Sequence, residues 1–375
     1  MNSIPGLKNR QKKKIRILIV DDSPVIRKIF TVMLGGEPDM EVVAAVPDPY
    51  VARDLIVREE PDVILLDIQM PRMDGLTFLR KLMKYFPVPV IIISSFTRNN
   101  SGLAMEAVET GAVDVLAKPD GSYTSSDLRL QLAHKIRAAA RVDVKANLKR
   151  KTAPPSPSSM PESNDRLFRV AHKIIAIGAS TGGTDALTQV ITAIPVNSPG
   201  IVMVQHMPAG FTHSFAERLN SLSRVRVKEA EDGDLVRPGT ALLAPGNYHM
   251  ILRSHPGGYK VKITEGPMVC HQRPAVDVLF DSVARYAGGN AVGIILTGMG
   301  NDGARGIISM KKAGALTIAQ DEKTSVVFGM PKEAIKTGCI DRVVPLRHVA
   351  GSIISMLLRE KGPESRSVYA EHCRA

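Results

Sequence analysis

Two runs of short apolar strands alternating with helical patterns constrain this chain more than any other feature. The first run covers residues 15–140, where the apolar segments are IRILIV, EVVAAV, DVILLDI, PVIIIS and VDVLAK. Amphipathic stretches such as 24–34 and 75–85 separate them. This alternation is typical of an open, doubly wound, mostly parallel sheet, so the run predicts an α/β domain.

A second run of the same kind extends from about residue 170 to 360, with strands in KIIAIGAS, GIVMVQHM, AVGIILTGM and ALTIAQD. Within it, residues 226–263 have the pattern of hairpins, which predicts a local antiparallel insertion. The Pro- and Ser-rich segment KTAPPSPSSMPESND separates the two runs and is typical of an extended linker. We expect two α/β domains, 15–140 and 170–360, joined by a linker over 141–169.

The net charge of +12 is concentrated in two short segments. Residues 1–16 hold six basic residues and no acidic one, and residues 128–151 hold eight basic residues and one acidic. A DNA-binding regulator would also need a helix-turn-helix, which the α/β pattern after residue 170 does not supply. The three cysteines are widely spaced, and the sequence has neither an apolar leader nor an apolar run long enough to cross a bilayer. We therefore expect a cytoplasmic protein that does not insert into a membrane. We also expect that it does not bind nucleic acid.

Polar residues follow the strands of the first domain at the points where they end. Asp21 and Asp22 follow the first strand, Asp67 ends the third, Ser94 ends the fourth, and Lys118 follows the fifth. The carboxyl ends of parallel strands share one edge of a sheet, so these groups are expected to meet. Carboxylates there suit Mg²⁺, and the set predicts a phosphoryl-transfer site with Asp67 as nucleophile. One acid alone would more simply cap a helix.

A serine lies in the glycine turn that ends the first strand of the second domain. Gly178, Ser180 and Gly182 fit the G-x-S-x-G spacing that exposes a nucleophile above a parallel sheet. A phosphate-binding loop is the alternative for such a turn, but Thr184 stands where that loop requires lysine. The turn therefore favours a nucleophilic serine.

A serine nucleophile needs a base and an acid that orients the base. His206 ends the next strand and Asp302 follows the strand AVGIILTGM, so both are expected on the same edge as Ser180. Capping of a helix is the alternative role for Asp302. The backbone N–H groups near Thr181 and Met299 lie on glycine-flanked turns and are candidate oxyanion donors. The order Ser, His, Asp along the chain differs from that of the α/β-hydrolases.

The first domain resembles a response-regulator receiver, through ILIVDDSPVIRK, VILLDIQMPRMDGL, IIISS and LAKP. The resemblance implies a flavodoxin-like fold in which Asp67 takes phosphate from a sensor histidine kinase. It implies that Asp21, Asp22 and Asp67 bind Mg²⁺, that Ser94 contacts the phosphoryl group and that Lys118 pairs with it.

The second domain is similar to the chemotaxis-type protein-glutamate methylesterase/deamidase. The motifs that carry this similarity are IGASTGGT, QHMPAGFTHSFAERL, AEDGD, LAPGNYHM, RPAVDVLFDS, ILTGMGNDGARG and TIAQDEKTSVVFGMP. The similarity implies a Rossmann-like catalytic domain without a cofactor, a triad of Ser180, His206 and Asp302, and oxyanion donors at the amides of Thr181 and Met299. It implies hydrolysis of glutamate methyl esters on chemoreceptors, and deamidation of receptor glutamines, in chemotaxis adaptation. A non-catalytic adaptor with this fold is the alternative that the intact triad disfavours.

The order of the two domains suggests a regulated enzyme. We expect the unphosphorylated receiver to pack against the catalytic cleft, and phosphorylation of Asp67 to weaken that contact. A linker of this length permits both docking and release.

Overall fold

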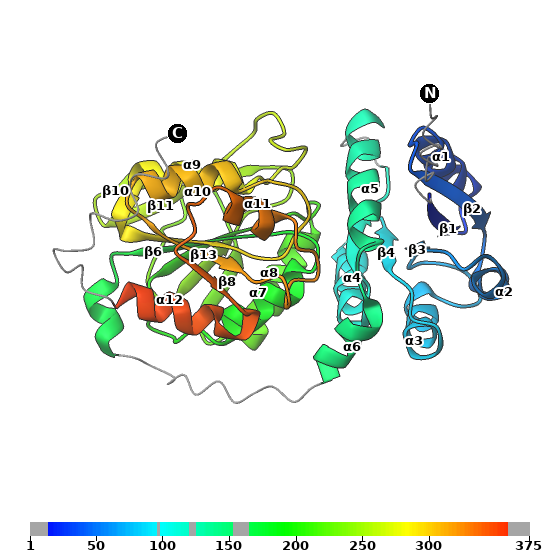
Figure 1. Cartoon of the computed structure of the whole chain (residues 1–375), viewed down its shortest axis with the longest axis horizontal. Helices are drawn as coiled ribbons and strands as arrows, with labels where there is room; N and C mark the ends of the chain where they lie inside the picture. The colour runs from blue at the N-terminus through cyan, green and yellow to red at the C-terminus, as the bar shows by residue number, and fades with distance from the viewer. Residues whose placement is uncertain (1–13, 96–97, 120–124, 153–164, 359–375) are drawn as a thin grey trace, which may run out of the picture.

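The computed structural model describes residues 14–95, 98–119, 125–152 and 165–358. The described chain forms two parallel sheets, one in each half, with helices on both faces (Figure 1). The expected α/β class with two doubly wound sheets is confirmed. The basic residues 1–13 lie outside the described ranges, so the structure does not place the first charged segment.

The N-terminal half is a five-stranded sheet in the order β2-β1-β3-β4-β5, with every neighbouring pair parallel. Two of its inner strands, VILLD and VIIIS, are buried at every position, as apolar runs in a parallel sheet require. The elements are β1 (Ile15–Val20), α1 (Pro24–Gly35), β2 (Met40–Val46), α2 (Pro49–Glu59), β3 (Val63–Asp67), α3 (Gly75–Tyr85), β4 (Val90–Ser94), α4 (Arg98–Thr110), β5 (Asp114–Ala117) and α5 (Ser125–Ala139).

The segment between the halves is partly helical. A helix, α6 (Val144–Thr152), occupies the start of the expected linker, and a short 3₁₀ helix, η1 (Asp165–Val170), ends it. Most of the Pro- and Ser-rich stretch, residues 153–164, lies outside the described ranges. The boundaries of the two domains and of the linker stay predictions.

The C-terminal half is a seven-stranded parallel sheet in the order β14-β13-β12-β6-β7-β9-β8. Its strands are β6 (Ile174–Ala179), β7 (Gly200–Gln205), β8 (Arg226–Glu229), β9 (Thr240–Leu243), β12 (Ala291–Ile295), β13 (Leu316–Gln320) and β14 (Arg342–Val344), and its hairpin is β10 (His249–His255) with β11 (Gly258–Thr264). Its helices are α7 (Gly183–Thr192), α8 (Phe211–Leu222), α9 (Val276–Tyr286), η2 (Gly288–Asn290), α10 (Ala304–Lys312), α11 (Met330–Lys336), η3 (Leu346–His348) and α12 (Val349–Leu357).

The antiparallel insertion is smaller than expected from residues 226–263. The strands β10 and β11 form the antiparallel hairpin, whereas β8 and β9 pair in parallel at the edge of the main sheet. Glycine-rich turns around short strands look alike in both arrangements. The sequence pattern therefore does not show which neighbour each strand pairs with.

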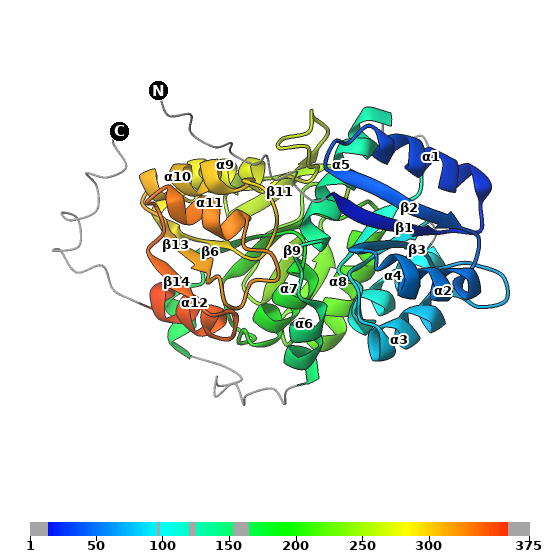
Figure 2. The same ribbon diagram turned by 45° about the vertical axis from the view of Figure 1, so that its right-hand side comes forward.

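Helices cover the C-terminal sheet on both faces. The helices α9, α10 and α11 lie over one face, and α7, α8 and α12 lie over the other (Figures 1 and 2). Along β6, Ile174 and Ala176 belong to the core beneath α9, α10 and α11, and Ile175 and Ile177 belong to the core beneath α7, α8 and α12. The alternation follows because successive side chains of a strand point to opposite faces of the sheet. The carboxyl ends of the central strands lie at one edge of this sheet, and the turns that lead from them into the helices carry the site.

The two halves are in contact. Helices α4 and α5 lie between the N-terminal sheet and the C-terminal half, with α4 beside α8 (Figures 1 and 2). None of the helices in the described ranges combines the length and apolarity needed to cross a membrane.

Candidate functional site

Ser180 lies on the turn between β6 and α7, where the strand order reverses direction. Its N–H donates to the Thr297 carbonyl at 3.0 Å, and its own carbonyl accepts from the Gly183 N–H at 2.6 Å. A Cβ on Gly183 would lie only 2.1 Å from Gln205 Oε1. The glycine is therefore required by the close approach of the turn to the neighbouring strand, and the switch point of the sheet carries the serine.

His206 and Asp302 form a buried pair on the same edge. His206 follows β7, and its N–H donates to the carbonyl of Ala179, the residue before Ser180, at 3.1 Å. The His206 Nε2 lies 2.7 Å from Asp302 Oδ2. Because a carboxylate only accepts, Nε2 carries the proton and Nδ1 is the basic nitrogen. Nδ1 is buried and has no hydrogen-bond partner in the described part of the chain.

The Asp302 carboxylate also accepts two backbone N–H groups. Val276 N donates to Oδ2 at 2.7 Å and Asp277 N donates to Oδ1 at 2.9 Å. These are the first two residues of α9, and a helix N-terminus favours negative charge. One carboxylate thus caps a helix and contacts His206, so its contacts are compatible with both expected roles, and its place in a triad stays a prediction.

The Ser180 hydroxyl makes no hydrogen bond to any residue in the described ranges, so contact between nucleophile and base is not formed in this state. Their backbones are nevertheless held together. Gln205 Nε2 donates to the Ser180 carbonyl at 2.9 Å and to the His206 carbonyl at 3.4 Å. The strand ends that carry the serine and the histidine are therefore fixed to one another by a single buried amide.

Thr181 and Met299 lie on turns next to Ser180. Neither backbone N–H donates a hydrogen bond to a described residue, and Thr181 is buried. The Thr297 hydroxyl donates to the Thr181 carbonyl at 3.0 Å and accepts from Val327 N at 2.9 Å, which fixes the first of these turns. The second turn is crowded, since a Cβ on Gly329 would lie 3.0 Å from the Cα of Met299.

Three carboxylates meet at the carboxyl edge of the N-terminal sheet. Oxygens of Asp21, Asp22 and Asp67 all lie within 4.8 Å of one another. Lys118 Nζ lies 2.9 Å from Asp21 Oδ2 and 2.8 Å from Asp67 Oδ2. Burial raises the pKa of Asp67 to about 6, and the hydrogen bond and charge of Lys118 oppose that rise. The three carboxylates therefore need nearby cations in order to remain ionised together.

Ser94 completes this edge. Its side chain is buried at the end of β4, and its carbonyl accepts from the Lys118 N–H at 2.9 Å. The donor set fits Mg²⁺, because carboxylate oxygens are the hard ligands that this ion prefers and Asp22 remains exposed to solvent. All five residues expected on this edge lie there.

Comparison with known families agrees with both sites. The family model "CheB methylesterase" matches residues 175–353, and the model "Response regulator receiver domain" matches residues 17–124. A protein-glutamate methylesterase/protein-glutamine glutaminase of Syntrophus aciditrophicus is 58% identical over 346 residues, which cover 92% of this chain and 99% of the relative. The chain belongs to the CheB methylesterase family.

Other relatives span the same length. A protein of the same description from Salmonella typhi is 50% identical over 349 residues, covering 92% of this chain and 97% of the relative. Among solved structures, the CheB methylesterase catalytic domain of Thermotoga maritima is 43% identical and covers 49% of this chain and 98% of its own, with a TM-score of 0.48. The two family models together show a receiver followed by a methylesterase domain in this chain.

The receiver contacts the methylesterase domain beside Ser180. The Thr181 hydroxyl donates to Asp114 Oδ2 at 2.8 Å. Lys135 on α5 lies 2.5 Å from the other oxygen of Asp114. Glu109 at the end of α4 pairs with Arg218 on α8 at 2.5 Å, with both side chains about half exposed. Asp114 begins β5, the strand that is followed by Lys118.

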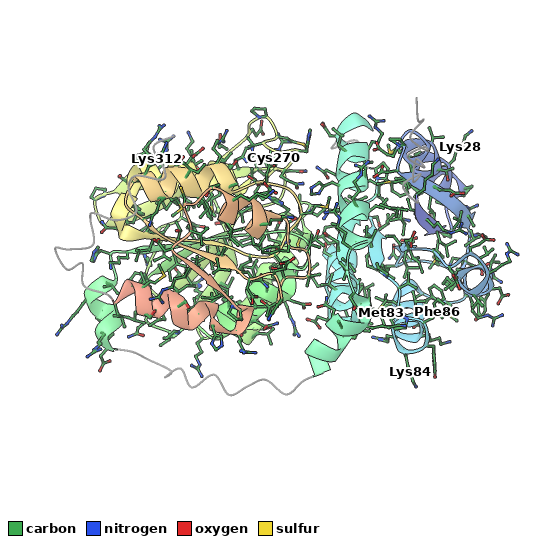
Figure 3. The ribbon with its side chains drawn as sticks, viewed as in Figure 1. Lys28, Met83, Lys84, Phe86, Cys270 and Lys312 are labelled. Atoms are coloured by element: carbon green, nitrogen blue, oxygen red, sulfur yellow. The ribbon has the colours of Figure 1, made fainter. Side chains whose placement is uncertain are left out.

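A second contact joins α5 to the loop that carries Met299. A Cβ on Gly300 would lie 3.2 Å from His134 Nε2, so the imidazole rests against the backbone of this loop. The pKa of His134 is lowered to about 4, chiefly by burial and in addition by the nearby charges of His206 and Lys135. Cys270 lies on the side of the methylesterase domain that faces α5 (Figure 3).

Sequence reasoning missed several residues that shape the site, namely Asp114, Thr297 and Asp277. Asp277 lies in the segment RPAVDVLFDS, where an acid early in a helix has the pattern of an ordinary cap. No local pattern indicates that its carboxylate reaches another helix. Asp114 begins a strand, and only the contact between domains gives it a role.

Proposed function

We propose that Ser180, His206 and Asp302 are the catalytic triad of this enzyme, a protein-glutamate methylesterase/protein-glutamine glutaminase of chemotaxis adaptation. The observation that carries the proposal is the buried 2.7 Å pair of His206 Nε2 and Asp302 Oδ2 beside the Ser180 turn. The other ring nitrogen has no hydrogen-bond partner among the described residues, as a general base requires before substrate binds.

The substrates are glutamate methyl esters of chemoreceptors. The Ser180 oxygen attacks the ester carbonyl carbon while His206 Nδ1 accepts the hydroxyl proton. Asp302 keeps the ring oriented and stabilises the imidazolium. The negative oxygen of the tetrahedral intermediate is bound by the amides of Thr181 and Met299.

His206 returns its proton to the leaving methanol as the acyl-enzyme forms. It then accepts a proton from the attacking water and passes it to the Ser180 oxygen as the acyl bond breaks, which releases the glutamate side chain. Receptor glutamines follow the same steps with ammonia as leaving group. Every step is performed by residues of the methylesterase domain, so the mechanism needs no metal there.

The receiver acts as the switch of this enzyme. Asp67 is its phosphoacceptor, and a sensor histidine kinase is the donor. Mg²⁺ would be held by Asp21, Asp22 and Asp67 and would supply positive charge for the phosphoryl oxygens. Lys118 pairs with the transferred group, and Ser94 contacts it.

We further propose that the unphosphorylated receiver restrains the esterase by docking on its site. The contacts of Thr181 with Asp114 and of the Met299 loop with His134 support this, because both oxyanion turns are covered. Phosphorylation draws Ser94 and Lys118 toward the phosphoryl group and weakens the docking. The enzyme is cytoplasmic, meets membranes only through its receptor substrates and does not bind nucleic acid.

The experiment that tests the proposal is methanol release from methyl-labelled chemoreceptor membranes. Wild type, Ser180→Ala and Asp67→Ala are compared with and without acetyl phosphate. We expect no release with Ser180→Ala, and stimulation by acetyl phosphate only when Asp67 is present. Release that survives Ser180→Ala would exclude this nucleophile.

A further inference from the structure

Two helices of the methylesterase domain cap each other at the site. Asp302, just before α10, accepts the N–H groups of Val276 and Asp277, which begin α9. In return, Asp277 Oδ1 accepts the Gly303 N–H at 2.9 Å and the Gly306 N–H at 2.7 Å, in the first turn of α10. The carboxylate of Asp302 thus caps α9, and the carboxylate of Asp277 caps α10.

The arrangement places two carboxylates close together in the interior. Asp277 and Asp302 are 3% and 2% exposed, and their oxygens lie within 4.8 Å of each other. Burial, together with the Asp302 charge, raises the pKa of Asp277 to about 6. The four N–H groups and the two helix N-termini offset this repulsion. The guanidinium of Arg305, 3.8 Å from Asp277 Oδ2, adds a further positive charge.

Close packing leaves little freedom at this junction. Gly303 has a φ of +91°, and a Cβ there would lie 2.8 Å from Val276 Cγ1. A Cβ on Gly306 would lie 2.5 Å from the Cβ of Phe280. The start of α10 therefore rests directly on α9, and the position of Asp302 depends on how the two helices meet.

The catalytic pair depends on the same junction. Asp302 Oδ2 is shared between Val276 N and His206 Nε2, both at 2.7 Å. A shift of α10 relative to α9 would draw this oxygen away from one donor or the other. Misplacement of a catalytic group by about 1 Å can lower a rate about a hundredfold.

We propose that Asp277 is a positioning residue of the esterase, which holds the Asp302 carboxylate on His206 by capping the helix that follows Asp302. The proposal rests on the proposed triad. It deepens that triad by one residue, which touches neither substrate nor His206 and acts through α10.

Variants at one position separate the hydrogen-bond acceptor from the charge. Asp277→Asn keeps an oxygen for the two N–H groups, whereas Asp277→Ala removes it. Asp281→Asn is the matched control, because Asp281 lies one turn later on α9 and its carboxylate accepts from Arg305 at 3.3 Å, with no hydrogen bond to the start of α10 among the described residues. The full chain is assayed with acetyl phosphate on methylated receptor membranes.

We expect Asp277→Ala to lower kcat about ten- to a hundredfold with KM changed less than about twofold. Asp277→Asn should retain most of kcat, and Asp281→Asn should match wild type. If Asp277→Ala does not fold, Asp277→Ser replaces it, since its hydroxyl is one bond too short to keep both hydrogen bonds. A folded Ala or Ser variant with wild-type kcat would overturn the proposal, and so would an Asn variant as impaired as Ala.

A second readout does not require activity. The proton on His206 Nε2 gives a downfield imidazole resonance in the proton NMR spectrum, which Asp302→Asn should abolish. We expect Asp277→Ala to shift or broaden this resonance and Asp277→Asn to keep it; an unchanged resonance in a folded Ala variant counts against the proposal. If wild type released no methanol, the proposed function would fail while this spectrum still tested the role of Asp277.

Discussion

The hydroxyl of Thr181 donates to the carboxylate of Asp114 across the boundary between the receiver and the methylesterase domain, at 2.8 Å. Thr181 follows the proposed nucleophile, and its amide is a proposed oxyanion donor. The receiver therefore contacts a residue of the proposed oxyanion site, and the contact is a hydrogen bond to a carboxylate that also pairs with Lys135.

Removing this hydrogen bond should release the enzyme from inhibition. A hydrogen bond to a charged group contributes about 1.5–3 kcal/mol, so Thr181→Val, which keeps the amide, should raise basal methanol release about tenfold or more. Thr181→Ser keeps a hydroxyl and should remain inhibited. Glu109→Gln is the control across the same boundary, because its exposed ion pair with Arg218 contributes at most about 1 kcal/mol. Equal effects of Thr181→Val and Glu109→Gln would contradict this ranking.

Docking of the receiver should weaken in mild acid. The pKa of His134 is about 4 in the docked state, against an ordinary value of about 6.5 in water. Between these values the undocked state binds more protons, so the docking constant is highest above pH 6.5 and decreases as pH falls toward 4. At pH 5.5 the docking constant should be about tenfold lower than at pH 7.5.

Small-angle scattering of the full chain across this pH range measures the separation of the domains. His134→Asn removes the titrating group and should flatten the dependence. An equally steep pH dependence in His134→Asn would assign the effect to another group.

Chelation of divalent cations should affect phosphoryl transfer in the receiver but not ester hydrolysis in the methylesterase domain. The receiver edge holds three acids that need a cation for phosphoryl transfer, whereas the proposed esterase mechanism uses only side chains and amides. We expect EDTA to abolish stimulation by acetyl phosphate and to leave basal methanol release unchanged. Return of stimulation on adding Mg²⁺ completes the test. A fall in basal release with EDTA would mean that the esterase itself uses a metal.

The turn after Ser180 should not tolerate a methyl group. Gly183→Ala would place its Cβ 2.1 Å from Gln205 Oε1 and 2.7 Å from Ala179 Cβ, so we expect a loss of about 1–3 kcal/mol in the free energy of unfolding. Gly351→Ala on α12 is the control, since nothing lies within 4 Å of its Cβ and alanine favours helix by about 1 kcal/mol. The free energy of unfolding of both variants is measured with urea. Similar values for Gly183→Ala and Gly351→Ala would show that the turn can widen to accept the methyl group.

The sequence predicted the fold, and it predicted which candidate site residues meet where the strands end. Ser180, His206 and Asp302 each follow a buried strand, and parallel pairing brings such ends to one edge whatever the details of packing. The residues Asp21, Asp67 and Lys118 meet for the same reason. The alternation of apolar strands with helical segments was sufficient to predict which residues meet at the carboxyl edge of each sheet.

Contacts between elements that are distant in sequence were not predictable. Asp277 reaches α10 only because α9 and α10 start beside each other, and Asp114 meets Thr181 only because two domains dock. The strands β8 and β9 were expected in an antiparallel insertion and lie in the main sheet, because partner choice depends on the whole topology. Local patterns specify elements, whereas the packing of one element on another decides these roles.

The strand β5 joins two events that a regulator must connect. Lys118, just beyond one end, pairs with the acids at the phosphoryl site, and Asp114, at the other end, binds Thr181. Four strand residues span about 13 Å, and a strand hydrogen-bonded to its neighbour resists stretching. A displacement at one end is therefore conveyed along the backbone to the other. Phosphorylation of the receiver by the proposed kinase can thus alter the contact with Thr181 in the esterase domain through a shift of only four residues.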